Sequence, residues 1–170
     1  MMRIGTSLLL VTMLSACGPA SPPRWAGREC TPAPRSLYER DLALPGRTLN
    51  VPPECCFVPG PLGGQIRCPE SALSWSLFAS PPGAQQVLDE YVNTYRNNTA
   101  GRVRERQLTC AIIGVPSPCY QFSAEEIPGP LQRLEALVGA VTVQGKGLVA
   151  ACQWVRGAGR PAVCRQLFTP

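Results

Sequence analysis

The stretch SALSWSLFASPPGAQQVLDEYVNTY (residues 71–95) holds the clearest structural pattern of the chain, a strand followed by a helix. At its start, Leu73, Trp75 and Leu77 alternate with serines, as in a half-buried strand. Ser80 can then cap a helix that begins at the next proline. Apolar residues recur beyond it at helical spacing: Ala84, Val87, Leu88, Tyr91, Val92 and Tyr95. This pattern predicts one main helix that packs through this face and ends at the residues NNTAG.

The rest of the chain predicts short strands and a second, weaker helix. Strands are expected at 47–51, 102–113, 119–125, 141–144, 147–155 and 162–168, and the short helix at 129–140. The segment 52–68 has four prolines, three glycines and two adjacent cysteines, so we expect a loop without regular structure. The predicted fold class is α+β: a small antiparallel sheet with one main helix packed on a face, rich in disulfides.

The first residues have the features of an export signal. A short basic start is followed by an apolar run that is shorter than the about 20 residues needed to span a bilayer. The run ends in Leu14-Ser15-Ala16-Cys17, which resembles the lipobox of bacterial lipoproteins. The resemblance implies cleavage before Cys17, a diacylglycerol on its thiol and a further acyl chain, such as palmitate, on its amine. The alternative is an ordinary signal peptide followed by a chance cysteine.

The same resemblance implies a location. Gly18 stands where lipoproteins of the inner membrane carry Asp, so we expect the outer membrane, with the domain facing the periplasm. The chain would then comprise a signal peptide (1–16), the lipidated cysteine with a proline-rich tether (17–36), and a single disulfide-stabilised domain (37–170). The tether has five prolines in the 18 residues 18–35, which favours an extended chain of about 3.1 Å per residue.

Eight of the nine cysteines remain once Cys17 carries the lipid, an even number that predicts disulfides in an oxidising compartment. Two pairs flank tight turns, and we expect the bonds Cys110–Cys119 and Cys152–Cys164. The adjacent Cys55 and Cys56 would bond Cys30 and Cys68, in either order. Zinc is the competing explanation, but the chain has no C-x2-C spacing and no histidine. We therefore expect neither a metal nor a cofactor.

The residues needed for common catalytic sites are scarce. The absence of histidine excludes Ser-His-Asp and Cys-His arrangements, and no C-x-x-C supports redox catalysis. Glu125 and Glu126 are adjacent, so they would point to different faces of an extended chain, unlike a glycosidase pair. The QGKG motif at 144–147 lacks the P-loop pattern. We expect no enzyme; a hydrolase with a carboxylate site is the remaining catalytic alternative.

Candidate partner contacts lie in two places. Arg102, Arg104 and Arg106 share one face of a predicted strand and would suit a phosphate-bearing or acidic partner. A charged edge strand, which discourages pairing with other chains, is the simpler explanation. Phe57 and Leu62, in the predicted loop 52–68, are the second group of candidates.

Together these observations predict a lipid-anchored, non-catalytic protein of the cell envelope, with an accessory, structural or binding role. Its partners would be the membrane, through the lipid, and another envelope protein or the cell wall, and not nucleic acid. The alternative is a periplasmic inhibitor or immunity protein directed against a toxin or hydrolase, because a rigid loop can block a site at low entropic cost.

The lipobox yields a direct test. Replacing Cys17 by Ser should abolish palmitate labelling and detergent partitioning, while the thermal unfolding transition of the domain stays in place. Labelling, phase partitioning and calorimetry measure the three quantities. A processed C17S protein that still partitions into detergent would contradict the lipoprotein interpretation, and loss of the unfolding transition would show that Cys17 is part of the fold.

Overall fold

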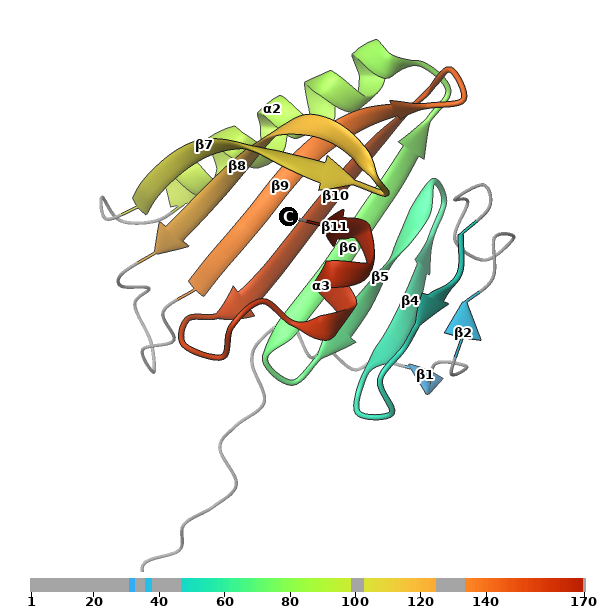
Figure 1. Ribbon diagram of the computed structural model, residues 1–170, viewed down its shortest axis with the longest axis vertical. Coiled ribbons are helices and arrows are strands. Elements are labelled where there is room, and N and C mark those ends of the chain that lie inside the picture. Colours follow the sequence, from blue (N-terminus) through green and yellow to red (C-terminus); the bar gives the residue numbers. More distant parts are fainter. Residues whose placement is uncertain (1–30, 33–35, 38–46, 99–102, 125–133, 170) are drawn as a thin grey trace, which may run out of the picture.

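Main-chain hydrogen bonds join nine strands into one curled antiparallel sheet (Figure 1). The computed structural model describes residues 31–32, 36–37, 47–98, 103–124 and 134–169, and all structural statements concern these ranges. Across the sheet the order is β1 (Thr31–Pro32), β4 (Cys56–Gly60), β5 (Gly63–Cys68), β6 (Ser71–Phe78), β10 (Lys146–Val155), β9 (Leu134–Val143), β8 (Val115–Ala124), β7 (Val103–Ile112) and β11 (Phe168–Thr169). The short strands β2 (Ser36–Leu37) and β3 (Leu49–Asn50) pair separately.

Two helices lie on opposite faces of this sheet (Figure 1). The long helix α2 (Pro81–Asn98) contacts β6, β9 and β10, as the apolar periodicity predicted. The short helix α3 (Ala162–Leu167) packs on the other side and contacts β3 and β6. We call the two sides the α2 face and the α3 face.

The predicted fold class is wrong in its proportions. Strands hold 58% of the described residues and helices 21%, so the domain is mostly antiparallel sheet and not a small sheet beside a helix. The main helix and the disulfide content agree with the prediction. Three local errors account for the difference, and each has a physical cause.

The first error is the helix expected at 129–140. The described part of that segment belongs to β9, which lies between β8 and β10. Leu137 and Val138 point to opposite faces of the sheet, and both are fully buried. A strand buried on both faces has a nearly continuous apolar run, and periodicity cannot distinguish such a run from a buried helix.

The second error is the loop expected at 52–68, most of which is the β4–β5 hairpin. The glycines here allow strands to approach closely. A Cβ on Gly63 would lie 2.2 Å from the carbonyl oxygen of Trp75 on the neighbouring strand.

The third error is the strand expected at 162–168. It is mainly helix α3, which buries Val163, Cys164 and Leu167 along one side.

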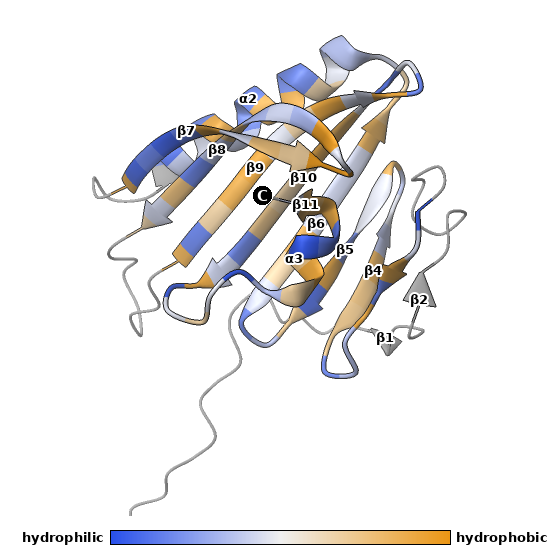
Figure 2. Cartoon of the chain, in the orientation of Figure 1, coloured by the Kyte–Doolittle hydropathy of each residue, from blue (hydrophilic) through white to orange (hydrophobic). Residues whose placement is uncertain are grey.

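The sheet separates two apolar clusters. On the α3 face, Leu73, Trp75 and Leu148 pack with Leu167 and Phe168. On the α2 face, the buried residues are Leu88, Val92, Phe122, Ala136, Val138 and Ala151. The central strands are accordingly the most apolar part of the ribbon in Figure 2, whereas the outer side of α2 and the start of β7 are polar.

Three disulfides reinforce this arrangement. Cys110–Cys119 joins β7 to β8 and Cys152–Cys164 joins β10 to α3, as predicted. Cys55–Cys68 closes the base of the β4–β5 hairpin and is one of the two alternatives left open for that group. Cys56 is also disulfide-bonded. Its expected bond to Cys30 involves a residue outside the described ranges and stays a prediction.

Two residues of the predicted tether, Thr31 and Pro32, form β1 and pair with β4. The remaining residues up to position 30, including Cys17 and the lipobox, lie outside the described ranges, so their predicted roles stay predictions. Neither described helix has the length and apolarity needed to cross a membrane.

The close approach at Gly63 predicts the effect of a single methyl group. Gly63→Ala should lower the free energy of unfolding by roughly 1–3 kcal/mol, because the main chain of β6 must move away. Gly60→Ala in the same hairpin is the matched control, since its Cβ would meet nothing nearer than 3.6 Å. Urea unfolding of both variants measures the difference. Equal destabilisation by the two substitutions would contradict the packing argument.

Candidate functional site

The two ends of the sheet differ in chemistry. One end holds the turn between β4 and β5 and the tight turns Ile113–Gly114 and Gln144–Gly145, beside the start of α2. Both residues of each tight turn have positive φ, from 50° to 86°, which is the type I′ geometry that suits the twist of a hairpin. We call this end of the sheet the hairpin end.

Charged residues are sparse at the hairpin end. Among the described residues that form its turns and adjoining strand ends, Lys146 is the only charged one. Arg47, which precedes β3, also reaches this end, where its guanidinium donates a hydrogen bond to the carbonyl oxygen of Ile113. The large apolar side chains that are most exposed within the described ranges, Leu62 at 46% and Val115 at 40%, both lie here. Leu62 lies in the β4–β5 turn and Val115 at the start of β8, with β6, β10 and β9 between β5 and β8.

Two grooves are present at this end. The proline groove, about 480 Å³ in volume, lies between the first turn of α2 and the adjoining ends of β8, β9 and β10. Its described lining consists of Pro81, Pro82, Ala84, Gln85, Val115, Pro116, Ser117, Pro118, Ala140, Val141, Thr142 and Gly147. None of these side chains ionises, so the groove offers shape and apolar contact and no acid–base group.

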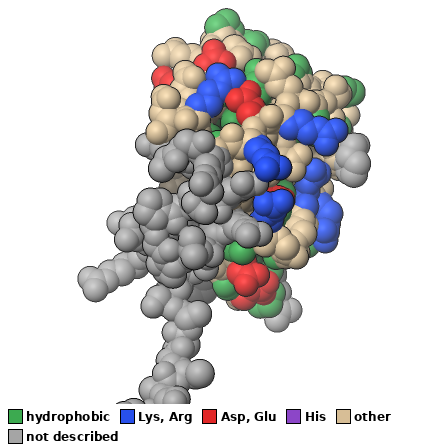
Figure 3. Space-filling view, turned by 90° about the vertical axis from the view of Figure 1, so that its left-hand side faces the viewer, with side chains coloured by type: hydrophobic (Ala, Val, Ile, Leu, Met, Phe, Trp, Pro, Cys, Tyr) green, Lys and Arg blue, Asp and Glu red, His purple; other side chains and the backbone are tan. Residues whose placement is uncertain are grey.

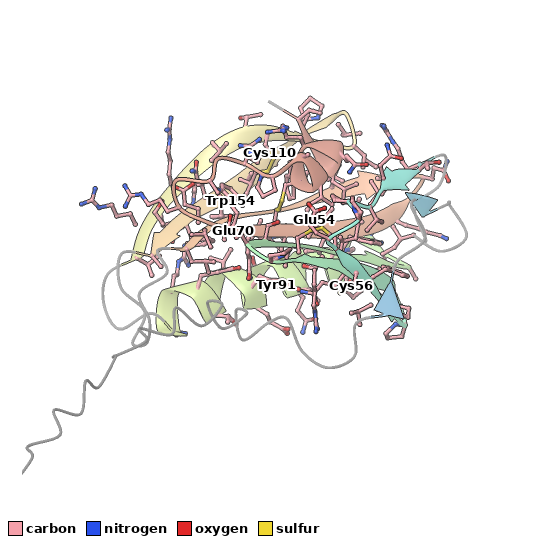
Figure 4. All side chains as sticks on the ribbon, turned by 90° about the horizontal axis from the view of Figure 1, so that it is seen from below. Glu54, Cys56, Glu70, Tyr91, Cys110 and Trp154 are labelled. Atoms are coloured by element: carbon pink, nitrogen blue, oxygen red, sulfur yellow. A yellow bond between two sulfur atoms is a disulfide. The ribbon has the colours of Figure 1, made fainter. Side chains whose placement is uncertain are left out.

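The hairpin groove, about 330 Å³ in volume, lies between the β4–β5 hairpin and α2. Its described lining comprises residues 58–65, residues 74–76 and Tyr91. Figure 4 shows Tyr91 and Cys56 on the α2 side of the sheet and Cys110 on the other side. The tyrosine is the single ionisable group in this lining, and Ser74, Ser76 and Gln65 supply neutral hydrogen-bonding groups.

The structure does not bring the two groups of predicted contact residues together. Arg104 and Arg106 are exposed on β7, whereas Phe57 and Leu62 belong to the β4–β5 hairpin, with five strands between β7 and β4. Arg102 lies outside the described ranges. The ring of Phe57 is half-buried and stacks on Trp75 at a centroid distance of 6.0 Å, so it supports the hairpin from within. Leu62 is the exposed member of its pair.

The first part of β7 is the outer strand of its side of the sheet, because β11 pairs only with Ala111 and Ile112. Figure 3 views the molecule from this side, where several Lys and Arg side chains gather. Arg104 pairs in register with Ser123, and Arg106 with Gln121, on the α3 face. This placement fits the charged edge strand that discourages pairing with other chains.

Glu105 points to the opposite face from its neighbours and meets α2. The guanidinium of Arg96 donates two hydrogen bonds to its carboxylate, at 2.7 and 2.6 Å. These bonds lower the pKa of Glu105 below its usual range and raise the pKa of Arg96. The pair joins the last turn of the helix to the edge strand.

The tyrosine stripe of α2 is part of the apolar packing, as expected. The ring of Tyr95 stacks on Phe122 at 4.8 Å, and its hydroxyl accepts a hydrogen bond from the side chain of Gln153. Burial raises the pKa of Tyr95 well above its usual range. On the α3 face, the indole nitrogen of Trp154 is buried without a hydrogen-bond partner. Neither group faces one of the two grooves.

Sequence reasoning missed the proline groove. The prolines at 81–82 and 116–118 were visible as helix-start and turn residues, but their meeting depends on β8 and β10 both adjoining β9. The described residues contain no group of three or more His, Cys, Asp or Glu side chains that could hold a metal ion.

In comparisons with known proteins, the chain matches no protein-family model and no curated protein. The class that its fold defines is a small, disulfide-bonded, antiparallel sheet domain with one long helix.

The Arg96–Glu105 pair predicts a pH-dependent contribution to stability. Because the pKa of Glu105 is lowered in the folded state, its contribution is present above the ordinary pKa of about 4.3 and is lost as the pH falls through the lower, folded value. Glu105→Gln should therefore destabilise the domain at pH 7 but not at pH 2, and Glu90→Gln on the exposed side of α2 is the control. Urea unfolding at both pH values checks this, and an equal effect of Glu105→Gln at both would contradict it.

Proposed function

We propose that this protein is a lipid-anchored, non-catalytic binding protein of the bacterial cell envelope. In this proposal, Cys17 carries the lipid in the outer membrane and the domain faces the periplasm. The domain holds another envelope protein against its hairpin end. The lipid part of the proposal is supported by the sequence Leu14-Ser15-Ala16-Cys17 and by the disulfides, which belong to an oxidising compartment.

The observation that carries the binding role is the make-up of the proline groove. Its described lining combines four prolines with Val115 and small side chains, and it contains no nucleophile paired with a base. Prolines and short turns fix the shape of the surface before a partner arrives, which lowers the entropic cost of binding. An uncharged, apolar centre is also what distinguishes the core of a protein–protein contact from the surrounding surface.

A second candidate function, inhibition of a toxin or hydrolase, is favoured by the β4–β5 hairpin. Its base is closed by Cys55–Cys68, its middle is supported by the Phe57–Trp75 stack, and Leu62 is exposed at its tip. A covalently braced hairpin with an apolar tip is a suitable shape for blocking an active-site cleft. The two candidates differ in which side chain makes the central contact, Val115 or Leu62.

Crosslinking in intact cells, followed by purification and mass spectrometry, tests both candidates. We expect one envelope protein to be recovered with the wild type and to be lost with Val115→Glu, since a buried unpaired carboxylate opposes contact. Arg106→Glu on the edge strand is the matched control and should leave recovery unchanged. Loss with Leu62→Glu instead would favour the inhibitor, and loss with Arg106→Glu alone would contradict both. Turnover of wall or glycan fragments by the purified protein would contradict the non-catalytic role.

A further inference from the structure

The strand β7 is an edge of the sheet over most of its length. Each residue of Val103–Ile112 pairs with one residue of β8, without a bulge. On the outer side of β7, β11 covers only Ala111 and Ile112. Among the described strands, none lies beside the remaining stretch from Val103 to Cys110, which is at the margin of the sheet in Figure 1. We call the outer side of this stretch the β7 edge.

The hydrogen bonds near the end of β7 show which main-chain groups face outwards. The N–H of Ile113 donates to the carbonyl oxygen of Leu167, on the outer side of β7, at 2.7 Å. Main-chain groups of an antiparallel strand point alternately to its two sides. The outward N–H and C=O groups of the β7 edge therefore include those of Glu105, Gln107 and Thr109. They form a row of alternating donors and acceptors.

The side chains along the β7 edge differ between the two faces of the sheet. Arg104 and Arg106 are exposed on the α3 face. On the α2 face, the carboxylate of Glu105 is held by Arg96, and the next side chains on that face are uncharged. A strand added at this edge would set its own side chains directly beside the two arginines, at positions where opposite Cα atoms are only about 4.5 Å apart. The edge therefore favours carboxylates on the α3 face and neutral side chains on the α2 face.

We propose that the β7 edge binds an extended acidic segment of a partner protein as an additional antiparallel strand. The segment carries Glu or Asp at alternate positions, beside Arg104 and Arg106, with neutral residues between them. Its main chain pairs with the outward groups of Glu105, Gln107 and Thr109. A phosphate-bearing surface, by contrast, supplies acceptor oxygens and would leave the outward carbonyl groups of the edge without donors. The alternation along the edge therefore selects a polypeptide.

The β7 edge is held in place before a partner arrives. The disulfide Cys110–Cys119 joins β7 to β8, and the Arg96–Glu105 pair joins the first half of β7 to α2. A strand that is already fixed loses little conformational freedom when another strand is added. The entropic cost of binding then falls mainly on the partner segment.

The same arginines act against pairing with a second copy of the chain. In antiparallel registers centred on residue 105 or 106, two β7 strands would set arginine opposite arginine. Like charges directly opposite one another are destabilising, whereas an acidic strand meets attraction at the same positions. The charged edge that discourages general pairing is thus selective for one kind of partner.

Peptide binding to the mature protein in non-ionic detergent tests the proposal. The probe is a fluorescent, end-capped, eight-residue peptide of alternating Thr and Glu, and fluorescence anisotropy measures its affinity. Arg106→Glu should weaken binding on the order of tenfold, because an attraction becomes a repulsion. Lys146→Glu, the same change of charge at the hairpin end, is the matched control and should leave the affinity unchanged. Equal weakening by the two substitutions, or no binding to the wild type, would overturn the proposal.

The inference does not rest on the proposed function, because it uses no residue of the proline groove. Val115→Glu should therefore leave the affinity for the peptide unchanged, whatever its effect on crosslinking in cells. Weakening of peptide binding by Val115→Glu to the same extent as by Arg106→Glu would place the peptide elsewhere and overturn the β7 edge as its site.

Methyl groups on the peptide nitrogens separate strand addition from simple charge attraction, with the wild-type protein alone. In the proposed antiparallel pairing, the N–H groups of the Thr residues face β7 and those of the Glu residues face away. N-methylation of the Thr residues should therefore abolish binding, and N-methylation of the Glu residues should preserve it, although both peptides have the same charge. Equal binding of the two methylated peptides would contradict strand addition.

A charge-swapped peptide tests the contact with Arg106 itself. A peptide of alternating Thr and Lys should bind Arg106→Glu on the order of tenfold more tightly than it binds the wild type, because the repulsion is replaced by an attraction. The thermal unfolding transition of the variant confirms that it is folded. A folded Arg106→Glu protein that binds the Lys peptide no better than the wild type does would refute the contact.

Discussion

Trp75, Leu148 and Phe168 pack on one face of the sheet while Leu88 and Val92 of α2 pack on the other, so the middle of β9 and of β10 is buried on both faces. Each large apolar side chain fully buried in this way contributes about 1.5–3 kcal/mol relative to exposure. The other features of the structure depend on this double burial. It orders the strands, fixes the side on which α2 lies, and forces polar residues towards the margins and ends of the sheet.

Double burial also explains which parts of the fold could be predicted. The segment 71–98 was predicted well because β6 is lined by serines on the helix side, and α2 has a solvent face, so both keep the alternation of a half-buried element. The segment of β9 lost that alternation because Leu137 and Val138 are both buried, and it resembled a helix. Cys110–Cys119 and Cys152–Cys164 were predictable because each pair flanks a short connection.

The candidate site was less predictable than the fold because it is made by contacts between distant segments. Leu62 was chosen from its position in a proline- and glycine-rich stretch, and it is exposed at the hairpin end. Phe57 was chosen on the same grounds, but its ring stacks on Trp75, which lies 18 positions later in the sequence and on the far side of β5. Val115 gave no signal of its own, since its exposure depends on the strand order around the first turn of α2.

The disulfides have a consequence for the order of assembly. Each described bond joins cysteines only 9 to 13 positions apart, whereas the seam between β6 and β10 pairs Ser76 with Val149. Closing a short loop is entropically easier than closing a long one, so these local cysteine pairs meet while the seam is still open. The disulfides within the segment before this pairing (β4–β6) and within the segment after it (β7–β11) can thus form correctly before β6 pairs with β10. Oxidation then has few wrong pairings to undo, and the slow step is left to the non-covalent pairing of β6 with β10.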